Sequence, residues 1–146
     1  MTNTRLVIAG RPHTDSIARE LKEVADGNPN VQFFLDFVDH DDVQKFMRAA
    51  DLIALPYKEI LNSGSAILAL SFDRPILVPA AGALTELYEM VGPEWVRLYE
   101  GELRPETIRD AVEWAVARQR QDRNSAPLQQ LNWDRIAELT IEAFAR

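Results

Sequence analysis

The loop over residues 56–65, with the sequence PYKEILNSGS, is the part of the chain whose residue types best suit binding chemistry. It follows an apolar run and ends in Ser63, Gly64 and Ser65, where a helical pattern begins. A helix start presents free backbone N–H groups and the positive end of the helix dipole. Because both features favour a negative charge, the loop is predicted to bind a phosphate group.

The elements that hold this loop alternate along the chain. Apolar runs predict strands at 6–9, 31–35, 51–55, 76–78 and 95–99. Helical spacing of apolar residues predicts helices at 16–26, 39–49, 63–72, 84–91, from 105 onward, and at 133–144. The alternation predicts an α/β protein with a Rossmann-like three-layer α/β/α fold. Its mainly parallel sheet should contain about five or six strands.

Composition excludes several functional classes. The 146 residues carry a dispersed net charge of −7, which argues against a nucleic-acid binder with a basic face. The chain has no Cys, which excludes disulfides and fits a reducing compartment, so we expect a cytoplasmic location. No apolar run reaches the roughly 18 residues of a membrane span. Two His without ligand spacing predict no metal site.

Ligands of open α/β sheets bind outside the carboxyl ends of the strands. The loops expected at those ends carry residues suited to anions and hydrogen bonds, namely Arg11, His13, Lys58, Glu59, Ser63, Gly64, Ser65, Gly82 and Glu86. Each also has a simpler interpretation. Ser63 could serve only as a helix N-cap, and Lys58 with Glu59 could form an exposed ion pair. Arg11 could be a solvated loop residue, and Gly82 could serve a turn with positive φ.

Several segments, taken in order, resemble a known family. They are AADLIALPY at 49–57, NSGS at 62–65, ALSFDRPILVP at 69–79, GALTEL at 82–87 and the pair Asn132-Trp133. Together they are similar to the C-terminal half of GT-B glycosyltransferases. The similar family is the large, mostly retaining one called group 1 or family 4. The resemblance covers residues 6–144.

The resemblance implies that the chain binds a nucleotide-sugar as substrate, without a cofactor or a bound metal. Carried over by position, the donor's diphosphate would be held by Asn62, Ser63, Gly64 and Ser65, with Lys58 and Arg11 as the basic candidates. The family commonly holds the ribose with a second glutamate. That position falls at Leu68, so a ribose contact is not expected from this residue.

The resemblance also assigns the remaining parts of the donor. Phe37 and Val38 would lie near the nucleobase. Glu59 matches the acidic residue that faces the donor sugar and is the catalytic candidate. Gly82 and Glu86 match the loop beside the sugar.

A GT-B enzyme has two Rossmann-like domains with the reaction in the cleft between them, and this chain has the length of one. The resemblance therefore implies a missing N-terminal acceptor-binding domain as partner, and a chain that is inactive alone. We expect residues 1–120 to form the nucleotide-sugar-binding domain and 121–131 a polar connection. Residues 132–146 would form a C-terminal helix, packed on this domain or toward the missing one. The process implied is polysaccharide biosynthesis, by hexose transfer with retention.

Two other functions stay open. One is a GT-B half of the nucleotide-sugar epimerase type, and the other is a non-catalytic α/β interaction domain. A response-regulator receiver is disfavoured because Gly10, Arg11 and Pro12 follow the first strand, where an acidic pair is needed. A dinucleotide-binding domain would need Gly-x-Gly-x-x-Gly at that place, and the motif is absent.

Overall fold

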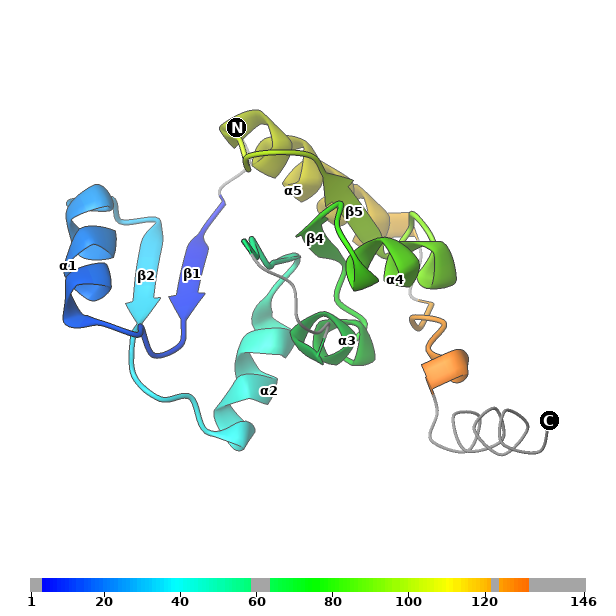
Figure 1. The fold of residues 1–146 in the computed structure, drawn as a ribbon, viewed down its shortest axis with the longest axis horizontal. Coiled ribbons are helices and arrows are strands. Elements are labelled where there is room, and N and C mark those ends of the chain that lie inside the picture. Colours follow the sequence, from blue (N-terminus) through cyan, green and yellow to red (C-terminus); the bar gives the residue numbers. More distant parts are fainter. Residues whose placement is uncertain (1–3, 59–63, 122–123, 132–146) are drawn as a thin grey trace. The chain divides into compact units, whose positions relative to one another are not determined.

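A computed structural model describes residues 4–58, 64–121 and 124–131 of the chain. Helices and strands alternate through them (Figure 1). Their order is β1 (Leu6–Ala9), α1 (Asp15–Val24), β2 (Val31–Phe34), α2 (His40–Ala49), β3 (Ile53–Ala54), α3 (Gly64–Ser71), β4 (Ile76–Pro79), α4 (Ala83–Val91), β5 (Val96–Tyr99), α5 (Pro105–Gln121) and the 3-10 turn Gln129–Leu131. The chain divides within α2 into two compact units, the first ending at Phe46 and the second beginning at Met47.

The first unit is a βαβ arrangement. Strands β1 and β2 pair in parallel, with Leu6 opposite Val31. Helix α1 begins after Thr14, whose Oγ1 accepts a hydrogen bond from the backbone N–H of Ile17 at 3.4 Å. Thr14 is therefore the N-cap of α1, because its hydroxyl satisfies one of the otherwise unpaired N–H groups of the first turn.

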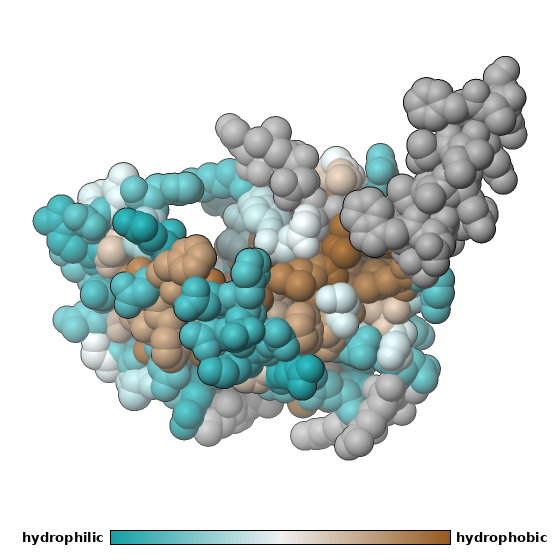
Figure 2. All heavy atoms as spheres, turned by 90° about the horizontal axis from the view of Figure 1, so that it is seen from below, coloured by the Kyte–Doolittle hydropathy of each residue, from teal (hydrophilic) through white to brown (hydrophobic). Residues whose placement is uncertain are grey.

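Large apolar side chains also reach the surface, and Figure 2 shows such residues among hydrophilic ones on the face in view. In the first unit, Val24 is 84% exposed and Phe37 74% exposed. None of the residues that the structure describes between 4 and 46 is buried. Two strands with one hydrophobic helix face do not normally form a stable core alone. The described residues of the first unit thus form no buried core of their own.

The second unit is built around a parallel sheet in the order β3-β4-β5. Side chains of β4 alternate between its two faces. Ile76 and Val78 belong to a cluster with buried residues of α3 and α4, whereas Leu77 packs in a second cluster with Ala111 of α5. Both faces are therefore covered by helices, which is why β4 is apolar at successive positions. The second unit has the predicted three layers.

The segment after α5 returns to the face of the sheet that α3 and α4 cover. Asp73, at the end of α3, has φ of +56°. Its carboxylate accepts hydrogen bonds from the backbone N–H of Ala126 at 2.9 Å and from Ser125 Oγ at 3.3 Å. Ala126 is buried, and Leu128 and Leu131 pack against the same core cluster. The segment at 125–131, which is polar in sequence, is thus attached to the core by hydrogen bonds and apolar contacts.

The predicted fold class is confirmed: the described residues form an α/β structure in which all paired strands are parallel, with five strands in two sheets. Most element ends agree with the expected ranges to within one or two residues. Strand β3 is the exception, because only Ile53–Ala54 of the expected 51–55 pairs as a strand. The helix expected at 133–144 lies outside the described residues, and the boundaries at 121 and 132 stay predictions. No described helix has both the length and the apolar character needed to cross a bilayer.

Candidate functional site

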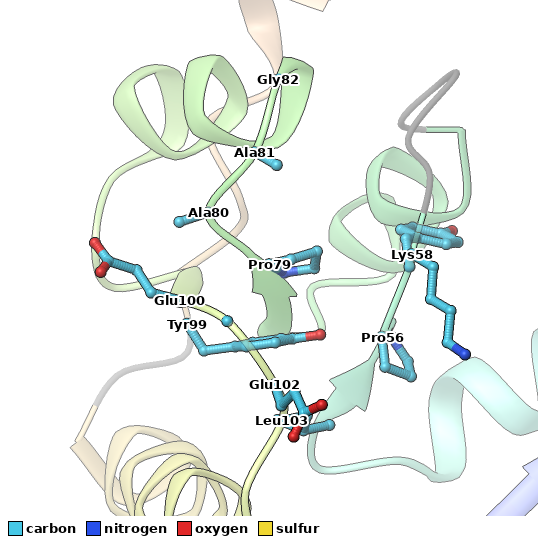
Figure 3. Close-up of a pocket in the computed structure, with 12 residues that line it drawn as sticks. Pro56, Lys58, Pro79, Ala80, Ala81, Gly82, Tyr99, Glu100, Glu102 and Leu103 are labelled. Carbon is cyan, nitrogen blue, oxygen red and sulfur yellow. The ribbon is translucent and has the colours of Figure 1, made fainter.

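A pocket of about 680 Å³ opens at the carboxyl ends of β3, β4 and β5 in the second unit (Figure 3). Three segments line it, one after each strand: Pro56, Tyr57 and Lys58; Pro79, Ala80, Ala81 and Gly82; and Tyr99, Glu100, Gly101, Glu102 and Leu103. The volume lies in the range usual for small-molecule sites. The position is the one expected for ligands of open α/β sheets.

Two of the predicted site residues line this pocket, Lys58 and Gly82. Lys58 is exposed, and it is the sole basic residue of the described lining. Gly82 stands before α4 with φ of +50°, a conformation that a residue with a Cβ rarely adopts. The expected turn with positive φ is therefore present, and it carries the chain past the pocket without a side chain.

The start of α3 is where the sequence places it. Gly64 and Ser65 open the helix, and both are exposed. They do not belong to the lining of the pocket. Glu59, Asn62 and Ser63 lie outside the described residues. The binding roles expected of these three residues and of Gly64 and Ser65 stay predictions.

The remaining predicted residues lie elsewhere. Glu86 is exposed in the first turn of α4 and is not part of the pocket lining. Arg11, Phe37 and Val38 belong to the first unit, where Arg11 and Phe37 are exposed and Val38 is half-buried. Of the predicted residues, the structure thus brings Lys58 and Gly82 to one pocket.

The third lining segment, which follows β5, was not predicted from the sequence. It contributes the aromatic ring of Tyr99 and the carboxylates of Glu100 and Glu102. Tyr99 is only 8% exposed, and burial raises the pKa of its hydroxyl above the ordinary value of 10.0. The rule on carboxyl ends could have found these residues, because Tyr99 ends the strand that was expected at 95–99.

A second, shallow depression lies in the first unit at the start of α2, lined by Asp39, His40, Asp41, Asp42 and Lys45. Lys45 Nζ and Asp42 Oδ1 form an exposed ion pair at 2.7 Å, and this partner raises the pKa of Lys45. Acidic residues at a helix start need no ligand, since they complement the dipole. Within the described part of the chain, no three metal-binding side chains gather into a candidate site.

No protein-family profile matches the chain. It is 33% identical over 140 residues to two proteins of Xanthomonas campestris pv. campestris, each named GDP-mannose:glycolipid 4-beta-D-mannosyltransferase. The matched region covers 95% of this chain. The chain is homologous to part of a glycosyltransferase. The resemblance stated from the sequence segments is thereby confirmed. The chain spans 39% of the length of each of these relatives.

For a glycosyltransferase homologue, the pocket chemistry is informative. Its lining combines a cation, two carboxylates and an almost buried tyrosine with the apolar surfaces of Pro56, Pro79 and Leu103. Apolar walls with a few convergent polar groups are typical of sites that orient a small polar molecule. The pocket is therefore our candidate functional site.

Proposed function

We propose that this chain is the donor-binding domain of a glycosyltransferase that transfers a hexose from a nucleoside-diphosphate sugar to an acceptor. The observation that carries the proposal is the pocket at the ends of β3, β4 and β5, in a chain similar over 95% of its length to enzymes named for GDP-mannose. The names of these relatives make GDP-mannose the first donor, and a glycolipid the first acceptor, to test.

The proposed chemistry is a substitution at the anomeric carbon of the sugar. The bond between this carbon and the diphosphate oxygen breaks, and a bond to an acceptor hydroxyl oxygen forms as that hydroxyl loses its proton. Negative charge grows on the departing diphosphate. Backbone N–H groups at the start of α3, at Gly64 and Ser65, and the ammonium group of Lys58 would stabilise that charge. No cofactor or metal enters this scheme, in which the nucleotide-sugar is the substrate.

Glu59 is proposed as the acidic residue that faces the sugar, with Gly82 and Glu86 in the loop beside it. The family resemblance implies retention at the anomeric carbon. The relatives' name, in contrast, specifies a β-linked product, which would form from the α-linked mannose of GDP-mannose by inversion. The configuration of donor and product, determined by NMR, decides between the two. A product with the donor's configuration supports retention, and the opposite configuration overturns it.

The proposed partner is an acceptor-binding domain that the described chain does not contain. Its support is that the chain spans 39% of its relatives. We therefore expect this chain alone to bind the donor without transferring the sugar.

The test is calorimetric titration of the protein with GDP, GDP-mannose and UDP. Ser65→Ala, in the first turn of α3, is compared with Ser71→Ala at the other end of the same helix. The proposal predicts saturable binding of one diphosphate that Ser65→Ala weakens and Ser71→Ala leaves unchanged. A folded protein that binds none of the three nucleotides contradicts the proposal. Equal weakening by both variants would contradict the assignment of the diphosphate to the start of α3.

A further inference from the structure

Tyr99 holds an unused polar group at the candidate site. The residue is 8% exposed, and its ring packs with Leu77 and Ala111 on the α5 face of the sheet. Leu103 packs against the same cluster. These neighbours are all apolar, so close packing holds the ring in place. Tyr99 is nevertheless also part of the pocket lining.

The hydroxyl of Tyr99 is directed into the pocket. Figure 3 shows the ring of Tyr99 passing below Pro79, which ends β4, with its hydroxyl oxygen toward Pro56, which follows β3. No hydrogen bond to this hydroxyl is made within residues 4–58, 64–121 and 124–131. The hydroxyl oxygen faces the space of the pocket, so a ligand that enters the pocket can form a hydrogen bond with it.

The protonation state of the hydroxyl fits this role. Burial raises the pKa of Tyr99 above 10.0, so the group stays a neutral donor and acceptor at neutral pH. A neutral hydroxyl can both donate to and accept from a second hydroxyl, whereas a phosphate oxygen only accepts. Lys58, on another part of the rim, is the lining residue suited to a phosphate.

The neighbouring surfaces also suit a sugar. Pro56, Pro79 and Leu103 offer apolar area to the C–H groups of a sugar ring, while Glu102 offers a carboxylate acceptor for its hydroxyls. The Tyr99 side of the pocket thus best fits a ligand with hydroxyl groups on a ring that has apolar C–H faces.

We propose that Tyr99 is a specificity-determining residue whose hydroxyl makes a hydrogen bond with one hydroxyl of the sugar bound in this pocket. The inference rests on the proposed function and deepens it, because it assigns the sugar end of the donor to the Tyr99 side of the pocket. Sites built to pair with a substrate hydroxyl discriminate strongly against analogues that lack it, since the protein group is then left buried and unpaired.

The test uses Tyr99→Phe, which removes the oxygen and keeps the ring. Affinities of the full-length protein for GDP and for GDP-mannose are measured by calorimetry. Tyr88→Phe is the matched control, because Tyr88 is a half-buried tyrosine of α4 outside the pocket lining. We expect Tyr99→Phe to bind GDP within about twofold of wild type and GDP-mannose about tenfold more weakly, a loss typical of one hydrogen bond. Tyr88→Phe should bind both ligands like wild type.

GDP-deoxymannose analogues, each lacking one hydroxyl, identify the group that Tyr99 contacts. For the analogue that lacks this hydroxyl, wild type and Tyr99→Phe should bind equally, while the other analogues keep the difference. Equal weakening of GDP and GDP-mannose by Tyr99→Phe, or no change in either, overturns the inference and leaves donor binding standing. A wild-type protein that binds GDP-mannose no better than GDP also overturns the inference alone. A wild type that binds neither overturns both the inference and the proposed function.

Discussion

The carboxylate of Asp73 accepts a hydrogen bond from the backbone N–H of Ala126 at 2.9 Å, across the core face that α3 and α4 share. The bond joins the end of α3 to the segment that follows α5. Because Ala126 is buried while Asp73 is exposed, the bond satisfies a backbone group that water reaches poorly. It marks the place where the chain turns back onto the core.

Removing this carboxylate should destabilise the second unit. Asp73→Ala loses the acceptor and also places a residue less tolerant of positive φ at +56°. We expect a loss of about 1–3 kcal/mol in the free energy of unfolding, measured by urea denaturation. Asp73→Asn keeps an acceptor oxygen and the tolerance of this conformation, so its loss should be well below that of the alanine variant. Equal losses in the two variants would show that the bond to Ala126 does not contribute.

Helix α3 offers a matched pair of leucines that separates core packing from helix propensity. Leu70 is fully buried, whereas Leu68 is 39% exposed on the same helix. Leu70→Ala should cost about 2–5 kcal/mol of stability because it leaves a cavity, and Leu68→Ala should cost about 1 kcal/mol or less. Thermal or urea unfolding of both variants measures the difference. If Leu68→Ala were as damaging as Leu70→Ala, the orientation of α3 described above would be wrong.

Lys58 should contribute to donor affinity through its charge. Lys58→Ala is expected to weaken binding of GDP and GDP-mannose alike by about tenfold at low salt, because a cation near the diphosphate is lost. The difference from wild type should shrink as salt is raised, since exposed charges are screened. Both are measured by calorimetry at two salt concentrations.

Lys45→Ala is the control for this prediction. Lys45 is also exposed, but it lies in the first unit and pairs with Asp42. The Lys45→Ala substitution should therefore leave the affinity for GDP and GDP-mannose unchanged. A similar weakening in both lysine variants would indicate a general charge effect on a chain of net charge −7 and not a contact at the pocket.

Tyr99 should make stability depend on pH at the alkaline end. The pKa of Tyr99 is about 10.0 in the unfolded state and is raised above this value in the folded state. At a pH between 10.0 and the folded pKa, the folded state therefore keeps a proton that the unfolded state has lost. The stabilising contribution is therefore fully present below pH 10 and is lost as pH rises through the folded pKa. Urea unfolding at pH 9 and at about pH 11 should show a steeper decline for wild type than for Tyr99→Phe. Parallel declines would show that Tyr99 titrates normally.

The elements and the region of the site were predictable from the sequence because both depend on local patterns. Apolar runs such as 76–78 and helix starts such as Thr14 follow from periodicity and capping, which involve near neighbours. The order of strands and helices then indicated which loops leave the carboxyl ends of the strands. Lys58 and Gly82, which were assigned to these loops in this way, line the pocket. The similarity to glycosyltransferases was visible in the order of the segments.

Only the tertiary structure showed that β3, β4 and β5 are neighbours, and so which loops meet. The order of strands in a sheet depends on long-range packing, which sequence periodicity does not encode. This order brings the segment of Tyr99 and Glu102 to the same pocket as Lys58. It also decides that Tyr99, whose ring is buried, belongs to the lining of the pocket. The sequence by itself determined the elements and their chemistry, while packing between distant segments determined which groups share a site.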